Sequence, residues 1–186
     1  YPANAFPSML EWLVQTCEYF AARPDLQLLI RVHPAEISGF PPSRQPILEE
    51  LRKRLPELAP NIIVVPPESD MSTYALMSLC NAAIIYGTKM GVELTSIGQP
   101  VIVAGEAWIR NKGLTHDART PEEYFAILDR LPFAERLTPS LLAKARRYAY
   151  HFFFNRMIPL PFIEPKAGYP IYRLKLDRLE DLLPGA

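Results

Sequence analysis

Short apolar runs alternate with amphipathic segments through the first two thirds of the chain, and this alternation constrains the fold more than any other feature. The apolar runs cover residues 26–32, 61–65, 82–86 and 100–104. Before and between them, apolar residues recur at helical spacing. Apolar strands separated by helices are typical of a parallel sheet with both faces covered. We therefore expect an α/β fold with a Rossmann-like, doubly wound parallel sheet and helices on both faces.

Helix boundaries are marked by capping and breaking residues. Ser8 is placed to cap a helix over residues 7–22, and Ser72 or Asp70 to cap one over 73–80. Thr120 and the proline after it begin another helix, and Gly98 ends one. The remaining helices are expected over residues 47–58, 89–97 and 139–155, the last with an aromatic cluster near its end.

The alternation and the prolines together predict the domain organisation. One α/β domain is expected over residues 7–158, because 186 residues suffice for one good core. Residues 1–6 are expected to be a linker at the edge of a longer protein. Residues 159–186 form a Pro-rich C-terminal extension, with a short helix expected over 174–183.

The charge balance gives no sign of a polyanionic partner. Lys and Arg number 20, as do Asp and Glu. We expect neither nucleic acid nor an anionic membrane to be the main partner, so any anion site must be built locally. No apolar stretch approaches the roughly 20 residues of a membrane span. The two cysteines lie in apolar stretches and suggest a reducing compartment, so a soluble, cytoplasmic protein is expected.

Ligands of open parallel sheets bind beyond the carboxyl ends of the strands, where the first run ends in Arg31 and His33. These side chains alternate with Val32 and so share one face. A guanidinium beside an imidazole suits a phosphate, by fork geometry and by hydrogen bonding or proton donation. The alternative is a His33 bonded to a backbone carbonyl, with Arg31 paired to Glu36.

A second anion site is predicted where the third run turns into a helix, at Gly87, Thr88 and Lys89. Backbone N–H groups at such a turn attract anions, and Thr88 adds a hydroxyl. The turn lacks the glycine spacing of a dinucleotide fingerprint and the Gly-Lys-Ser/Thr of a triphosphate loop. Glu93, farther along the helix, is placed to accept hydrogen bonds from the two hydroxyls of a ribose. The alternative is that its charge only interacts favourably with the helix dipole.

Other polar residues near the strand ends have two interpretations each. Ser69, Ser72 and Thr73 suit a nucleobase, but helix capping explains them equally well. Arg110 and Lys112 lie on the loop after the fourth run, where loops often reach ligand. The alternative for both is an exposed basic loop.

The sequence suggests neither a metal site nor a serine nucleophile. His33, His116 and His151 have no neighbouring Cys or Asp at the spacing of zinc sites. His151, within the aromatic segment, is expected to be structural. No serine lies in a Gly-x-Ser-x-Gly elbow.

These motifs, taken in order, resemble a known family. Residues 30–36 (Ile-Arg-Val-His-Pro-Ala-Glu), 72–85 and 87–103 resemble the C-terminal domain of capsule polysaccharide biosynthesis proteins. These are GT-B glycosyltransferases similar to the Kdo transferases of capsule assembly, and more distantly to sialyltransferases and UDP-N-acetylglucosamine epimerases. The likeness runs from about residue 26 to 128, and residues 111–115 (Asn-Lys-Gly-Leu-Thr) also look like a segment of such proteins.

The resemblance implies roles for particular residues. His33, in the His-Pro motif, would hold the donor phosphate and act in catalysis, Thr88 would bind phosphate, and Glu93 would bind ribose. Where epimerase-like relatives have Ser-Gly-Gly, this chain has a tyrosine before Gly87 and Thr88. The departure leaves CMP-, CDP- and UDP-sugars as alternatives.

The resemblance also implies an activity. Residues 7–158 would bind the nucleotide-sugar donor in half of a GT-B fold, without metal or other cofactor. A missing N-terminal domain would complete the enzyme, and a glycan or lipid-linked acceptor would receive the sugar. Peripheral association with inner-membrane assembly machinery is compatible with this role. The alternatives are an epimerase-like enzyme and a non-catalytic nucleotide-binding or scaffold domain.

Overall fold

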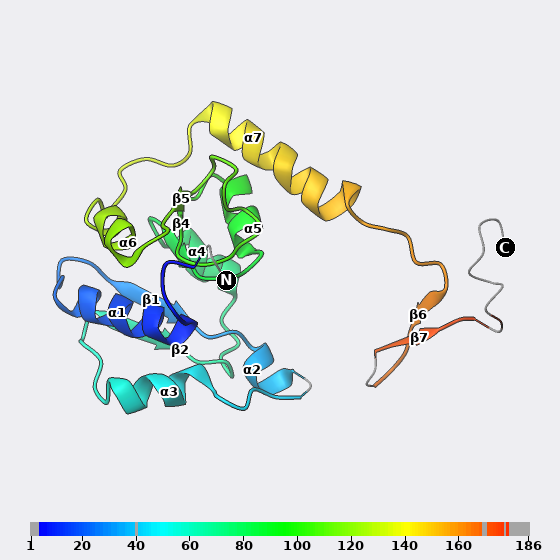
Figure 1. Ribbon diagram of the computed structural model, residues 1–186, viewed down its shortest axis with the longest axis horizontal. Helices are drawn as coiled ribbons and strands as arrows, with labels where there is room; N and C mark the ends of the chain where they lie inside the picture. The colour runs from blue at the N-terminus through cyan, green and yellow to red at the C-terminus, as the bar shows by residue number, and fades with distance from the viewer. Residues whose placement is uncertain (1–3, 40, 169–170, 177, 179–186) are drawn as a thin grey trace. The chain divides into compact units, whose positions relative to one another are not determined.

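The computed structural model describes residues 4–39, 41–168, 171–176 and 178 (Figure 1). It divides into two compact units, residues 1–149 and 150–186. The first unit contains the parallel strands, and the second contains a β-hairpin. The division falls at the last residues of helix α7 (Pro139–Tyr150), whereas the sequence placed a boundary between residues 158 and 159.

The strands of the first unit are short and parallel. β1 (Leu28–Arg31) pairs with β2 (Ile62–Val65), and β3 (Ala83–Ile85), β4 (Val101–Val103) and β5 (His116–Asp117) pair in that order. The four predicted strands and the α/β class are therefore confirmed. Over the described residues the hydrogen bonds form two small parallel sheets, so one continuous sheet is not seen.

The helices begin at the predicted caps but often end earlier. Ser8, Ser72 and Thr120 each accept from the backbone N–H three residues on. The helix predicted over 47–58 ends at Arg54, because a proline follows Leu55 and disfavours the helical conformation there. The helices of the first unit are α1 (Met9–Ala21), α2 (Ala35–Ser38), α3 (Ile47–Arg54), α4 (Thr73–Ser78), α5 (Met90–Ser96), α6 (Pro121–Leu128) and α7.

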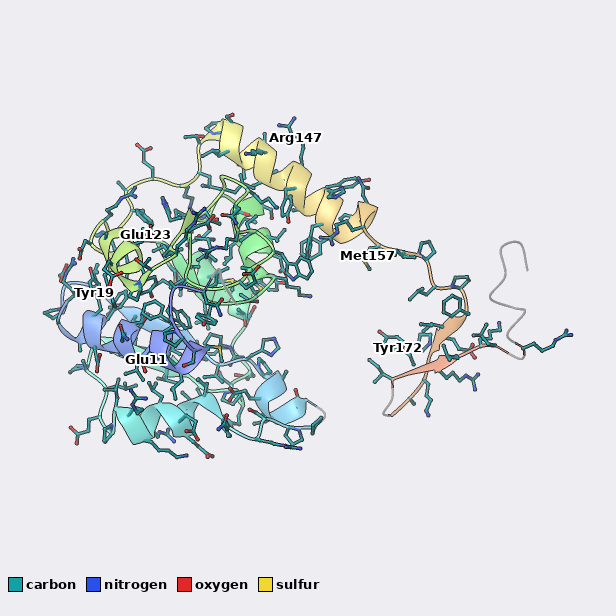
Figure 2. All side chains as sticks on the ribbon, viewed as in Figure 1. Glu11, Tyr19, Glu123, Arg147, Met157 and Tyr172 are labelled. Atoms are coloured by element: carbon teal, nitrogen blue, oxygen red, sulfur yellow. The ribbon has the colours of Figure 1, made fainter. Side chains whose placement is uncertain are left out.

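The core forms where α1 packs against α6. Tyr124 is fully buried, and its hydroxyl lies 2.8 Å from that of Thr16. Its ring meets Phe6 edge-on, with 5.2 Å between the ring centroids. At the surface end of the same contact, Tyr19 (labelled in Figure 2) lies on α1. It stacks on Phe125 and donates to Asp129.

Residues 4–6, expected to belong to a linker, pack into the first unit. Ala5 and Phe6 are buried, and the Ala5 N–H donates to the Ala104 carbonyl at 2.7 Å. The Phe6 carbonyl accepts from the Tyr86 hydroxyl at 3.0 Å. This segment therefore reaches the carboxyl ends of β3 and β4, the edge where ligand residues were predicted.

The second unit begins at the end of the aromatic helix. The helix predicted over 139–155 is α-helical to Tyr150 and continues as the π-helix η1 (His151–Asn155). β6 (Ile163–Pro165) and β7 (Tyr172–Leu174) then form an antiparallel hairpin within the Pro-rich extension. Leu174 is thus in a strand, because it pairs with Ile163, and residues 177 and 179–183 of the helix predicted over 174–183 lie outside the described residues.

Candidate functional site

Arg31 is bound to the loop that follows β2. Its Nη1 donates to the carbonyls of Val32 at 2.9 Å and Pro66 at 2.6 Å, and its Nη2 donates to the Ser69 carbonyl at 3.1 Å. The Glu36 carboxylate accepts instead from the Ile47 N–H at the start of α3, with both N···O distances 3.2 Å. The alternative Arg31–Glu36 pair is therefore not formed. Arg31 fixes the β2–α4 loop and leaves its charge at the end of β1.

His33 is exposed just beyond β1, with its tautomer set by the backbone. Its Nδ1 accepts from the Ala35 N–H at 3.0 Å, so it does not donate to a backbone carbonyl from that atom. In a neutral imidazole one nitrogen accepts and the other donates. The proton therefore lies on Nε2, which is suited to donate to an anion and not to act as a base.

The turn after β3 is closely packed on its inner side. The Thr88 hydroxyl accepts from the Met90 N–H at 3.3 Å, while Gly87 and Lys89 are exposed. A Cβ on Gly91 would lie 2.7 Å from side-chain atoms of both Ile85 and Ile109. Glycine at this position lets α5 lie directly against β3, so the turn is held in a fixed place.

Glu93 is bonded to α4, a contact that the sequence did not predict. The Tyr74 hydroxyl donates to Glu93 Oε2 at 2.7 Å, and this hydrogen bond raises the pKa of Tyr74. Ser72 caps α4 by accepting from the Ala75 N–H at 3.5 Å, the structural role left open for it. The start of α4, with Ser72 and Thr73, thus lies beside the glutamate of α5.

The structure connects part of the predicted site. Arg31 holds the loop through Ser69, the loop leads into α4 at Ser72, and Tyr74 of α4 contacts Glu93. His33 follows Arg31 by two residues. Over the described part of the chain, no hydrogen bond joins His33 to the turn at residues 87–89.

Lys112 lies elsewhere, with α7. It is exposed, its Nζ is 5.8 Å from the centroid of the Tyr148 ring, and its carbonyl accepts from Lys144 Nζ at 2.7 Å. Arg110, two residues earlier, is only 4% exposed, so an exposed loop was the wrong expectation for it. Its guanidinium donates to the Gly105 and Ala118 carbonyls at 3.0 and 2.6 Å.

The chain matches the family of capsule polysaccharide biosynthesis proteins over residues 3–142. It belongs to this family. The match covers all of the predicted donor-site residues, from Arg31 to Lys112, and confirms the resemblance to the family. Family membership points to a role in capsule polysaccharide synthesis. No curated protein and no solved structure matches the chain.

In this member of the capsule family, the surroundings of His116 suit a structural role. It lies in β5 and stacks on Phe133, with 4.6 Å between ring centroids and 26° between planes. Burial lowers its pKa, Arg130 lowers it further, and Asp117 raises it. Within the described residues, no cluster of three His, Cys, Asp or Glu residues is arranged to hold a metal ion.

The lowered pKa of His116 predicts a pH dependence of stability. The unfolded chain binds more protons than the folded one between the two pKa values, so stability falls as the pH drops below about 6.5, the ordinary histidine value. We expect His116→Gln to lose less free energy of unfolding than wild type between neutral and acidic pH, measured by urea unfolding. His151→Gln, at an exposed histidine, should follow wild type, and equal acid sensitivity of all three proteins would contradict the assignment.

A cleft of about 230 Å³ lies away from the candidate site. Residues 78–81 and 133–136 line it. Residues 78–81 precede β3, whereas the candidate site follows the strands. The cleft therefore borders the amino end of β3 and is separate from the candidate site.

Proposed function

We propose that this chain is the donor-binding part of a GT-B glycosyltransferase. It would move a sugar from a CMP-, CDP- or UDP-sugar to a capsular or other surface polysaccharide at the cytoplasmic side of the inner membrane. Family membership supports the capsule role, and polar residues after parallel strands support a nucleotide site. The two small sheets would be halves of one doubly wound arrangement. A further N-terminal domain would supply the pocket for a glycan or lipid-linked acceptor.

The geometry of His33 is the observation that carries this proposal. Because Nδ1 accepts from the Ala35 N–H, Nε2 presents a proton from an exposed side chain. A phosphate oxygen of the donor would accept that proton in a hydrogen bond. Negative charge grows on the phosphate as the glycosidic bond breaks, so this donor would act most strongly in the transition state. His33 would thus be catalytic, and Arg31 would add positive charge.

The other predicted residues would each bind a different part of the nucleotide sugar. Gly87, Thr88 and Lys89 would bind phosphate through N–H groups, a hydroxyl and an ammonium. Ser72 and Thr73 would border the nucleobase, next to the loop that Arg31 holds. Glu93 would bind ribose with the carboxylate oxygen that Tyr74 does not engage. Lys112, which lies with α7, would reach only an extended part of the donor.

Isothermal titration of the whole chain with CMP, CDP and UDP tests the proposal. We expect one nucleotide to bind, and His33→Ala to weaken that binding on the order of tenfold to hundredfold, the value of a hydrogen bond to a charged group. His151→Ala, at an exposed histidine in η1, is the matched control and should bind as wild type does.

Three results would decide against this reading. A chain that is folded by circular dichroism and binds none of the three nucleotides would overturn the donor site. Interconversion of two nucleotide sugars by the chain alone would favour the epimerase-like alternative. Nucleotide binding that His33→Ala leaves unchanged would favour a non-catalytic binding domain.

A further inference from the structure

The chain as a whole has no net charge, but one segment of it is strongly basic. Residues 136–163 contain five basic side chains and no Asp or Glu. The same segment contains the aromatic cluster and spans α7 and η1. A long basic segment without acids favours an anionic partner, although the whole-chain balance gave no reason to expect one. The basic residues are Arg136, Lys144, Arg146, Arg147 and Arg156.

The outer side of α7 joins a neighbouring loop in one basic and aromatic surface of the first unit. The Tyr148 hydroxyl donates to the Trp108 carbonyl at 2.6 Å, Lys112 Nζ lies over the Tyr148 ring, and Lys144 Nζ donates to the Lys112 carbonyl. Trp108 is 56% exposed, and Arg147 extends from α7 (Figure 2). We call these five residues, Trp108, Lys112, Lys144, Arg147 and Tyr148, the α7 patch.

The opposite side of α7 explains why this face is turned outward. Ala145 is fully buried, and Arg146 Nε donates to the Ser96 carbonyl at 3.2 Å. Residues three and four apart share a helix face, so Lys144, Arg147 and Tyr148 lie together on the other side. The first unit thus holds α7 through Ala145 and Arg146 on one side, and through hydrogen bonds of Lys144 and Tyr148 to backbone carbonyls on the other. Lys144 and Arg147 nevertheless remain exposed.

The second unit, considered by itself, exposes apolar side chains in the same segment. Tyr150 and Phe154 are 60% and 66% exposed, and their rings lie 5.2 Å apart. Met157 and Ile158 are exposed by 70% and 79%.

We propose that the α7 patch binds the surface of an anionic lipid bilayer, and that the exposed side chains of Tyr150, Phe154, Met157 and Ile158 in the second unit contact the same kind of surface independently. Trp and Tyr rings suit the headgroup region, basic side chains pair with lipid phosphates, and aliphatic side chains reach the upper acyl chains. Surfaces that bind proteins also favour Trp, Tyr and Arg but are depleted of Lys, which this patch presents twice. No helix of the described residues is long and apolar enough to cross the bilayer.

Co-sedimentation of the whole chain with lipid vesicles tests this inference. We expect binding to mixed phosphatidylcholine–phosphatidylglycerol vesicles, weakened by salt, and little binding to phosphatidylcholine alone. Each basic residue at an anionic surface contributes about fivefold in affinity, so Lys144→Gln with Arg147→Gln should weaken binding about 25-fold. Neither residue belongs to the proposed donor site, and Lys144 contacts Lys112 only at its backbone carbonyl, so nucleotide binding should be unchanged.

A matched variant separates a local patch from net charge. Arg52→Gln with Lys53→Gln removes the same charge from the exposed basic face of α3 and should leave vesicle binding unchanged. Trp108 gives a second readout, because its emission should shift to shorter wavelength on anionic vesicles. Trp108→Phe should abolish that shift and leave Trp12 as a silent reference. Phe154→Ser should weaken binding through the second unit alone.

Three results would overturn the inference. The first is no binding to phosphatidylglycerol vesicles at low salt. The second is equal weakening by the α7 and α3 double variants, which would show only a net-charge effect. The third is self-association of the chain, seen by light scattering and abolished by the Lys144 and Arg147 substitutions, which would make the patch an interface between copies.

Discussion

Replacing Tyr124 with alanine should lower the free energy of unfolding by about 4 kcal/mol, the usual cost of removing a large buried aromatic side chain. Tyr124 is fully buried where α6 meets α1. Its ring contacts Phe6 and Phe125 at centroid distances of 5.2 and 5.3 Å. The substitution would leave a cavity between segments that are far apart in the sequence. Urea unfolding followed by circular dichroism measures the loss.

Tyr124→Phe is the matched control, because it keeps the ring and removes only the hydroxyl. The Thr16 hydroxyl would lose one partner but still donate to the Trp12 carbonyl at 2.6 Å. We therefore expect a loss of about 1 kcal/mol, the value of one ordinary hydrogen bond. If alanine cost no more than phenylalanine, the ring would not support the contact between α1 and α6.

Arg110→Met should lower the free energy of unfolding by about 3 kcal/mol. The buried guanidinium donates to the carbonyls of Val103, Gly105 and Ala118, at distances of 3.4, 3.0 and 2.6 Å. Methionine fills similar space but donates no hydrogen bond, so these carbonyls would lose a buried partner. The loop between β4 and β5 would then be held less firmly, which urea unfolding should report.

Two further substitutions test whether geometry or charge matters at Arg110. Arg110→Lys keeps the charge but replaces the planar fork with a compact ammonium, so an intermediate loss is expected. Arg119→Met, at an exposed arginine, should change stability by no more than about 0.5 kcal/mol. Equal losses at positions 110 and 119 would mean that the buried hydrogen bonds do not stabilise the fold.

The predicted helices and strands were confirmed where local signals were complete. Ser8 and Thr120 cap helices as predicted, because a cap needs only a side chain and an N–H group three residues away. The apolar runs became β1 to β4 for a similar reason, since a buried strand needs continuous apolar residues. β5 and α2 are too short to leave a periodic pattern.

Features that depend on distant residues were missed. Residues 4–6 look like part of a linker until Ala5 is seen to bond to Ala104. Arg110 looks like a loop arginine until the carbonyls of neighbouring segments surround it. No spacing in the sequence identifies either partner, because each pair forms only after the strands are arranged.

The candidate site shows the same difference between features set by the local sequence and features set by distant residues. The sequence by itself determined which residue types follow the strands, and so placed Arg31 and His33 at the end of β1. The tertiary structure alone decided their partners: Arg31 binds a loop 35 to 38 residues away and not Glu36, and Glu93 binds Tyr74, 19 residues before it. The physical reason is the distance along the chain over which each kind of interaction acts. Caps and periodicity act within about four residues, whereas side-chain partners depend on which segments the folded chain brings together.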